Sequence, residues 1–346
     1  MSELLTRAID HLADGQDLSE TDAAEALAEI MAGEATDIEI AGFLIALRVK
    51  GETVAELAGL ARTMRALAAF VRTESADLLD TAGTGGGRTT FNVSTTAALI
   101  AAAAGCTVAK HGSRSSTGLS GSADLLEALG ARIDLDPAAV GRCIDEVGFG
   151  FMFAPHHHPA SARVVKVRKE LKVRTTFNFL GPLTNPAGAR RQLLGVADMA
   201  KLPKLAGALA LLGTDHAMLV SSDDSLDELS VSAATRVIEV RGESIAQYTV
   251  IPEDLGLARH PADTVPGGDP AHNAAIARAI FAGEPGAARD LAVLNAGAAI
   301  YVGGQAETLG EGVALAEQAL DSGAAAAKLE AFIARSSALA PPEAGR

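Results

Sequence analysis

The sequence predicts an α/β protein in which a small all-helical domain is followed by a larger α/β domain with a mainly parallel central sheet. Residues 1–70 have the pattern of capped helices, and from Leu78 onward short apolar runs that end in Gly, Ser or Asp alternate with helical stretches. The chain has 346 residues, of which 48% are hydrophobic. It is therefore long enough for two domains and too apolar to be disordered.

The helical segment at the start of the chain is marked by N-capping sequences. In each of them a hydroxyl side chain precedes an acidic residue by three positions, the pattern of a capping box: Ser19–Asp22, Thr36–Glu39 and Thr53–Glu56. Apolar residues follow at helical spacing, as at Leu57, Leu60, Met64 and Leu67. We assign residues 1–72 to the small domain and expect helices from about 165–190 to join it.

The larger domain is predicted to comprise residues 73–164 and 191–346. Four apolar runs predict strands of its parallel sheet: 78–82, 106–109, 149–154 and 216–221. Two later segments, 237–240 and 247–251, predict further β structure outside this run of strands, and residues 270–320 are predicted to be helical. In such a sheet, ligands bind at the carboxyl ends of the strands.

Charge and apolar patterning exclude several classes of protein. The chain has 43 acidic and 29 basic side chains, a formal net charge of −14, which argues against bulk nucleic-acid binding but allows a small anionic substrate. No apolar run is long enough to cross a bilayer, and the N-terminus lacks the basic flank of a signal peptide. Two cysteines, Cys106 and Cys143, cannot form a disulfide framework. We expect a cytoplasmic protein with neither a membrane nor a nucleic-acid partner.

A glycine-rich loop follows the first predicted strand and leads into a helix that begins near Asn92. Its glycines, Gly83 and Gly85–Gly87, allow close approach of a phosphate to the backbone, and the helix amino terminus adds a partial positive charge. Asn92, Ser94 and Thr95 supply side-chain donors. The spacing is neither that of a Walker loop nor GxGxxG. We interpret the loop as a phosphate site, and the alternative is a plain tight turn.

A second polar loop, Lys110–Ser122, follows the next predicted strand. It contains two cations, Lys110 and Arg114, together with a histidine, several hydroxyls and three glycines, and no acid occurs before Asp124. A flexible surface loop is the alternative interpretation. Because the two loops follow successive strands, we expect them to form one anion-binding site.

A run of acidic residues follows the predicted strand at 216–221 in the sequence. Four acids stand within residues 221–230, and hard divalent cations such as Mg²⁺ prefer carboxylate oxygens while bridging to substrate phosphates. A solvated loop is the alternative. The three consecutive histidines, His156–His158, are interpreted as a polar wall of the site, because consecutive rings rarely converge on one metal ion. Arg168 alone indicates no more than an exposed helix cation.

Taken together, these motifs resemble the anthranilate phosphoribosyltransferases of tryptophan biosynthesis. The resemblance extends to about residue 300 and rests on these segments: Gly83–Gly86, Thr90–Thr95, Lys110–Gly112, Gly121–Asp124, Val167–Lys169, Gly181–Pro186 and Leu226–Glu228. It implies a homodimer with the fold of nucleoside phosphorylases. It also implies Mg²⁺-dependent transfer of phosphoribose from 5-phosphoribosyl 1-pyrophosphate (PRPP) to the amine of anthranilate.

The resemblance also implies roles for individual residues. PRPP would contact Gly83, Gly86, Gly87, Thr90, Asn92, Val93, Ser94, Thr95, Lys110, His111, Gly112, Ser113, Arg114, Ser115, Ser116, Thr117, Gly118 and Ser122. Anthranilate would contact Gly83, His111, Ser113, His158 and Arg168. Mg²⁺ would be held by Ser94, Asp227 and Glu228, and the catalytic residues would be Lys110, Arg168 and His111.

The chain departs from the family pattern in two places. The family usually has Asp then Gly after Gly-Thr-Gly-Gly, whereas here Gly87, Arg88 and Thr89 supply one residue fewer and no acid, so we assign no metal role to Gly87. Ser113 stands where the family usually has Asn. Two alternatives therefore stay open: a related transferase with another aromatic amine acceptor, favoured by Ser113, and a non-catalytic nucleic-acid-binding relative, disfavoured by the net charge and the intact Asp227-Glu228 pair.

Overall fold

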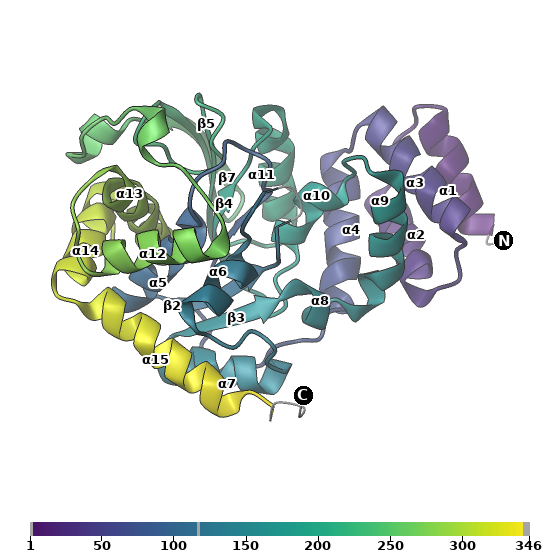
Figure 1. Ribbon diagram of the computed structural model, residues 1–346. Coiled ribbons are helices and arrows are strands. Elements are labelled where there is room, and N and C mark those ends of the chain that lie inside the picture. The colour runs from purple at the N-terminus through teal and green to yellow at the C-terminus, as the bar shows by residue number, and fades with distance from the viewer. Residues whose placement is uncertain (1–2, 116–117, 342–346) are drawn as a thin grey trace.

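The computed structural model describes residues 3–115 and 118–341, which form a helical domain beside a larger α/β domain (Figure 1). The helical domain contains α1 (Glu3–Ala13), α2 (Glu20–Ala32), α3 (Asp37–Lys50) and α4 (Val54–Ala66). The predicted helix starts are confirmed. Ser19 caps α2, and Thr36 and Thr53 each form a complete capping box at the start of α3 and α4.

A later segment of the chain returns to the helical domain. Helix α9 (Ala162–Leu171) packs against α2 and α3, and the short elements α8 (Ala154–His157), η1 (Pro159–Ser161), α10 (Phe177–Leu180) and η2 (Gly181–Leu183) lie on either side of it in the sequence. Val164, Val167, Leu180 and Leu183 belong to the same apolar core as the first four helices. Residues far apart in the sequence therefore share one apolar core.

The α/β domain is built on a seven-stranded sheet with the order β3-β2-β1-β4-β5-β6-β7. Its strands are β1 (Leu78–Gly83), β2 (Thr107–Gly112), β3 (Phe149–Phe153), β4 (Arg191–Gly195), β5 (His216–Ser222), β6 (Thr235–Arg241) and β7 (Ser244–Val250). The first five pair in parallel and the last two are antiparallel, which confirms the mainly parallel sheet and the further β structure. Strand β4 was not predicted.

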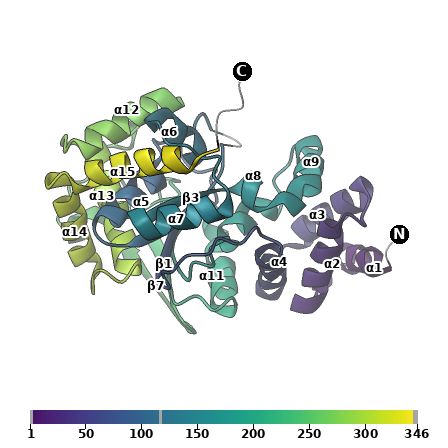
Figure 2. The ribbon, with the colours of Figure 1, turned by 90° about the horizontal axis from the view of Figure 1, so that it is seen from below.

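Helices cover both faces of the sheet. Helices α5 (Val93–Ala103), α7 (Pro137–Val147) and α13 (Ala287–Val302) pack on one face, and α11 (Leu202–Leu211) packs on the other, between the sheet and α4. Figure 2 shows α15 (Ala324–Leu339) running over α5 and α7. Side chains of β5 alternate between the layers: Met218 and Val220 join the α13 core, whereas Ala217 and Leu219 join the α11 core.

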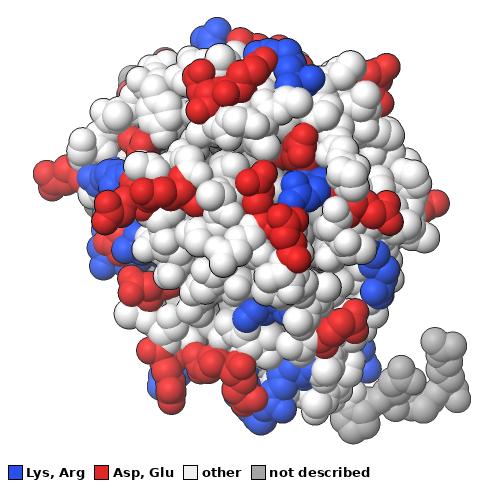
Figure 3. All heavy atoms as spheres, turned by 90° about the vertical axis from the view of Figure 1, so that its left-hand side faces the viewer, with Lys and Arg blue, Asp and Glu red and all other residues white. Residues whose placement is uncertain are grey.

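The remaining elements complete the outer layer. They are α6 (Ser122–Leu129), η3 (Met199–Lys201), η4 (Pro252–Leu255), η5 (Ala262–Thr264), α12 (Pro270–Phe281) and α14 (Leu309–Asp321). Helices α12, α13 and α14 confirm the helical prediction for 270–320. No helix in the described ranges is both long and apolar enough to span a membrane. On the face drawn in Figure 3, acidic and basic side chains are interspersed, and most basic side chains lie beside acidic ones.

The strand order places a crevice between β1 and β4. After β1 the chain adds β2 and β3 on one side of it, and β4 then pairs on the other side. The connections that follow β1 and β4 therefore leave the sheet in opposite directions, which opens a ligand-binding crevice at the carboxyl ends of these strands.

Candidate functional site

The glycine loop leaves β1 at this crevice and is held to the end of β4. The amide of Thr84 donates to the carbonyl oxygen of Gly195 over 2.8 Å. Gly85 and Gly86 have φ of 62° and 91°, a conformation that favours glycine, and a β-carbon at Gly86 would collide with the guanidinium of Arg174. Both glycines are therefore favoured by backbone conformation, and at Gly86 a larger residue would also displace the Arg174 side chain.

Helix α5 begins at the end of this loop without a side-chain cap. The Asn92 side chain at the cap position instead bonds Ser120 and Asn273, which ties the first loop to the second loop and to α12. Val93 points into the core, and the Thr95 hydroxyl is fully buried with no hydrogen-bond partner in the described structure. Asn92 therefore does not cap this turn: the Val93 amide donates to the Phe91 carbonyl oxygen at 2.8 Å, and the Ser94 amide donates to Glu228.

Lys110 brings a buried cation to the same place. Its side chain is 1% exposed, and Nζ donates to the carbonyl oxygen of Thr81, to Thr81 Oγ1 at 3.1 Å and to Ser94 Oγ at 3.5 Å. Burial lowers the pKa of Lys110 to about 8, although Asp80 and Glu228 favour the charged form. The ammonium group joins the two loops, as their positions after neighbouring strands predicted.

Asp80 and Asn185 are functional neighbours that were assigned no role from the sequence. Asp80 is fully buried; it accepts from the His111 amide at 3.1 Å and from Asn185 Nδ2 at 2.8 Å. Burial raises the pKa of Asp80 to about 6, against the opposing charge of Lys110. Asn185 lies within the Gly181–Pro186 motif and Asp80 within the predicted strand 78–82, but a sequence cannot show that they meet. They fix β1, β2 and the turn after η2 relative to one another.

The acidic turn after β5 separates into paired and unpaired carboxylates. Asp223 lies 3.6 Å from Arg236 and Asp224 lies 3.0 Å from Arg88, whereas Asp227 and Glu228 form no ion pair with the described residues. Burial raises the pKa of Asp227, and burial together with the Asp227 charge raises that of Glu228 to about 8. Two half-buried carboxylates that form no ion pair with the described residues make a site that favours a cation.

The same two carboxylates face the loops predicted to bind phosphate. Glu228 accepts from the backbone of Ser94, and Asp227 accepts from the backbone of Gly85. Within the described residues no group of three or more His, Cys, Asp and Glu side chains could enclose a metal ion. A bound Mg²⁺ would therefore take oxygens from Asp227, Glu228 and the Ser94 hydroxyl and complete its shell with water or phosphate, a mixed set that suits this ion.

Two neutral histidines lie side by side at the end of β2, and Arg168 on α9 forms no ion pair with the described residues. The His111 and His158 rings lie 5.0 Å apart between centroids, and each has a buried Nε2 without a hydrogen-bond partner in the described structure. Burial lowers the pKa of His111 and lowers that of His158 to about 4. The Arg168 guanidinium lies over the Phe177 ring, 5.7 Å from its centroid. Its Nε is buried and has no hydrogen-bond partner in the described structure, and burial lowers the pKa of Arg168. The Arg168 guanidinium can therefore receive a carboxylate.

The other two histidines of the triplet have different surroundings. His157 is buried, and its Nδ1 lies 3.2 Å from the carbonyl oxygen of Ala69, so it fastens the linker after α4. His156 is exposed and stacks edge-on against Phe153. Of the three consecutive histidines, His158 alone therefore lies beside His111 of the second loop.

Arg114 was expected to bind an anion, but it is not a free cation in the second loop. Its guanidinium pairs with Asp124 at 2.7 Å and with Glu127 at 2.6 Å, both on α6, and lies over the Phe153 ring. The first acid after the loop thus reaches back and neutralises it. Lys110 remains the cation of this loop that faces the crevice.

The rest of the second loop is closely packed. A β-carbon at Gly112 would collide with Ser122 Oγ, which itself donates to the Ser113 carbonyl oxygen at 3.2 Å. The Ser115 hydroxyl accepts from the Gly118 amide at 2.7 Å. In the first loop, Gly83 ends β1 beside Asp227, and the Thr90 hydroxyl bonds the Phe91 carbonyl oxygen. The predicted residues Ser116 and Thr117 lie outside the described residues.

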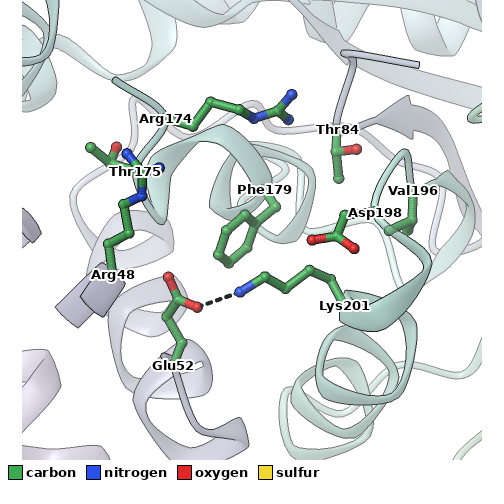
Figure 4. Close-up of a pocket in the computed structure, with 9 residues that line it drawn as sticks. All are labelled: Arg48, Glu52, Thr84, Arg174, Thr175, Phe179, Val196, Asp198 and Lys201. Atoms are coloured by element: carbon green, nitrogen blue, oxygen red, sulfur yellow. Dashed lines mark hydrogen bonds and ion pairs between the residues drawn. The ribbon is translucent and has the colours of Figure 1, made fainter. Parts of the chain in front are cut away.

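A cavity of about 200 Å³ lies beside the glycine loop, where the two domains meet (Figure 4). Glu52 from the helical domain forms an ion pair of 2.7 Å with Lys201 and accepts from the Thr176 hydroxyl at 2.6 Å. Arg174 and Thr84 line the opposite wall (Figure 4). The cavity thus joins the crevice to the interdomain contact, and the Glu52–Lys201 pair links the two domains below it.

Comparisons with known proteins agree with this geometry. Residues 6–68 match the model of the glycosyl transferase family, helical bundle domain, and residues 75–326 match that of the glycosyl transferase family, a/b domain. An anthranilate phosphoribosyltransferase from Rubrobacter xylanophilus is 52% identical over 339 residues, which cover 97% of this chain and 99% of the relative.

Solved structures give the same result. The crystal structure of anthranilate phosphoribosyltransferase from Thermus thermophilus has a TM-score of 0.91 and 44% identity, covering 95% of this chain and 99% of that one. The enzyme from Saccharomyces cerevisiae in complex with PRPP and Mg has a TM-score of 0.89 and 29% identity, with 98% and 99% covered. The chain belongs to the anthranilate phosphoribosyltransferase family.

Proposed function

We propose that this chain transfers the phosphoribosyl group of PRPP to the amine of anthranilate in tryptophan biosynthesis. The bond between C1 of the ribose and the pyrophosphate oxygen breaks, a bond between C1 and the amine nitrogen forms, and the amine loses one proton. The observation that carries the proposal is the convergence, at one crevice, of the glycine loop, a buried Lys110 and two carboxylates that form no ion pair with the described residues. Family membership agrees with it.

The two loops are assigned to PRPP. The backbone of the glycine loop, the first turn of α5 and Lys110 are donors that suit phosphate oxygens and the negative charge that develops on the departing pyrophosphate. Because these donors are fixed before the reaction starts, they stabilise that charge without reorganising. The polar residues of the second loop are assigned to the same substrate, except Arg114, whose guanidinium is already paired.

Mg²⁺ is assigned to Asp227, Glu228 and Ser94. When bound, the ion would neutralise the pyrophosphate charge in its ground state and as it leaves. The residues fit this role, because burial raises the pKa of both carboxylates and neither forms an ion pair with the described residues. The Ser94 hydroxyl lies on the first turn of α5, where the phosphate donors begin.

Arg168 and the two neutral histidines are assigned to anthranilate. A planar guanidinium can hold a carboxylate by two hydrogen bonds, and the Arg168 guanidinium has no carboxylate partner in the described structure. The aromatic amine is neutral at pH 7, so it needs no strong base to attack, and much of the rate comes from holding it in line with C1. His111 and His158 are neutral, because burial lowers the pKa of both, and they add no charge to that of Arg168.

The proposal extends to the organisation of the protein. We place the enzyme in the cytoplasm, divide the chain into residues 1–72 with about 165–190 and the remaining α/β part, and expect a homodimer. Helix α3 supports the last point, because Ile38 and Val49 on it are 83% and 80% exposed. Size-exclusion chromatography with light scattering tests the dimer, and Ile38→Glu with Val49→Glu is expected to give monomers.

Product analysis tests the function and separates it from the two alternatives. The purified chain is mixed with PRPP, Mg²⁺ and a panel of aromatic amines, and products are identified by mass spectrometry. The proposal expects phosphoribosylated anthranilate and pyrophosphate in equal amounts. Transfer to another amine in preference to anthranilate would support the first alternative. No transfer together with a gel shift on single-stranded DNA would support the second.

A further inference from the structure

The shortened glycine loop rests directly on the turn that carries the two unpaired carboxylates. A β-carbon at Gly87 would lie 2.6 Å from Asp227 Oδ1 and 2.8 Å from the Ser225 carbonyl oxygen, so no side chain fits there. The next amide, that of Arg88, donates to the same Ser225 carbonyl oxygen over 2.7 Å. The loop and the turn are thus joined along their backbones.

The Arg88 side chain extends this contact to a third segment. Its Nη2 bonds Asp224 Oδ2 at 3.0 Å, and its Nη1 donates to the carbonyl oxygen of Ala262 in η5 at 2.6 Å. The Arg88 and Asp224 side chains are only 23% and 14% exposed, so solvent screens this ion pair less than an exposed one. One guanidinium therefore holds the glycine loop, the acidic turn and η5 together.

Asp224 is itself fixed from the opposite side. Its carboxylate accepts from the Ser222 hydroxyl at 2.6 Å and from the Ser230 hydroxyl at 3.0 Å. The following residue, Ser225, has φ of 65°, a conformation that residues other than glycine adopt only where their surroundings hold it. The sharp turn that carries Asp227 to the glycine loop is therefore held by the anchor on Asp224.

We propose that the Arg88–Asp224 ion pair is a positioning element for Mg²⁺, holding the acidic turn so that Asp227 and Glu228 face the glycine loop. This inference rests on the proposed function. Arg88 itself reaches neither carboxylate in an ion pair, and its charge is used by Asp224. Because Asp227 and Glu228 are enclosed and repel each other, the turn relaxes when the anchor is removed, and preorganised metal binding is lost.

Metal binding without turnover tests the inference. Mn²⁺ is titrated into the protein with PRPP and no anthranilate, and protein-bound Mn²⁺ is measured by water-proton relaxation. Arg88→Ala and Asp224→Ala are each expected to weaken Mn²⁺ binding about tenfold or more. The double variant is expected to bind Mn²⁺ no more weakly than either single variant, because both substitutions remove the same interaction. Arg88→Lys, which keeps a single charge, is expected to be intermediate.

Activity and a neighbouring ion pair provide the controls. The Mg²⁺ concentration for half-maximal rate is expected to rise in the same variants, whereas the KM for anthranilate at saturating Mg²⁺ is expected to stay within about twofold, as for sites with no shared contacts. Arg236→Ala breaks the exposed Arg236–Asp223 pair of the same turn and is expected to bind Mn²⁺ like the wild type.

Wild-type affinity in Arg88→Ala and Asp224→Ala would overturn the inference, and so would strictly additive losses in the double variant or an equal loss in Arg236→Ala. If Arg88→Ala fails to give a cooperative thermal melt, Asp224→Asn and Arg88→Lys decide by the same measurements. The proposed function is judged separately on the wild type. A wild type that transfers phosphoribose while Arg88→Ala keeps its Mn²⁺ affinity contradicts only the positioning role.

Discussion

Gly195 at the end of β4 lies against the backbone of Asp227, so closely that a β-carbon at position 195 would collide with the Asp227 carbonyl oxygen. Gly195 also accepts the Thr84 amide from the glycine loop at 2.8 Å. One backbone position thus sets the separation between the phosphate loop and the carboxylate turn. The site depends on this contact as much as on its charged side chains.

Gly195→Ala is expected to destabilise the protein and lower kcat. Because the new methyl group meets rigid backbone, the turn must shift, at a cost of about 1–3 kcal/mol in the free energy of unfolding. Urea denaturation and steady-state kinetics measure the two effects. Gly310→Ala is the control, because its β-carbon would have open space within α14. A Gly195→Ala enzyme with wild-type stability and kcat would show that the contact does not matter.

Arg168→Ala is expected to raise the KM for anthranilate far more than the KM for PRPP. Loss of a charge-assisted contact of about 1.5–3 kcal/mol corresponds to roughly 10- to 150-fold. Steady-state kinetics with each substrate varied in turn measures both constants. Arg163→Ala on the same helix, which removes an exposed bond to the Gly33 carbonyl oxygen, is expected to change neither much. Equal increases in both constants for Arg168→Ala would refute its assignment to the acceptor.

Lys172→Gly is expected to stabilise the protein. Lys172 ends α9 with φ of 54° and ψ of 26°, a left-handed conformation that glycine adopts without the steric cost of a β-carbon. The gain is expected to be about 0.5–1 kcal/mol in urea denaturation. Lys169→Gly, one turn earlier in the same helix, is expected to have the opposite sign. Destabilisation by Lys172→Gly would mean that the lysine side chain contributes more than the backbone conformation costs.

Glu239→Gln is expected to flatten the acid dependence of stability. Burial alone would raise the pKa of Glu239, but hydrogen bonds from His216, Arg241, Tyr248 and Tyr301 outweigh it and lower the pKa to about 2. Since the folded pKa lies below the ordinary 4.5, this stabilisation is complete above pH 4.5 and is lost as pH falls toward 2.

The Glu239→Gln variant should therefore be less stable than the wild type at pH 7, by an amount on the order of 2 kcal/mol, and should approach it near pH 3. Denaturation at a series of pH values measures this. Glu330→Gln breaks an exposed ion pair with Arg278 and serves as the control, with little change expected at any pH. A constant difference between wild type and Glu239→Gln at all pH values would contradict the account.

Much of the fold could be predicted because its signals are local. Thr36 and Thr53 cap their own helices, and the apolar runs at 78–82 and 216–221 coincide with buried strands. Strand β4 was missed because Arg191–Gly195 is short, begins with two polar residues and lies between turn residues. Its place in the sheet comes from pairing with β1 and β5, which a single sequence does not display.

The site shows the same division between local and long-range information. The positions of the loops after β1 and β2 predicted that Lys110 would meet the glycine loop. Neutralisation of Arg114 by Asp124 and Glu127 depends on how α6 is oriented, and the lack of space at Gly87 depends on the turn at Asp227, some 140 residues later in the chain. Such pairings follow from tertiary packing rather than from the residue types alone.

The most direct test of the central claim is the fluorescence of anthranilate in the presence of the purified chain. The account predicts that fluorescence falls only when protein, PRPP and Mg²⁺ are all present, and that pyrophosphate appears in step with the fall. Arg168→Ala should slow the fall at low anthranilate and less so at high anthranilate. Unchanged anthranilate fluorescence at high concentrations of folded wild-type protein, PRPP and Mg²⁺ would contradict the proposed function.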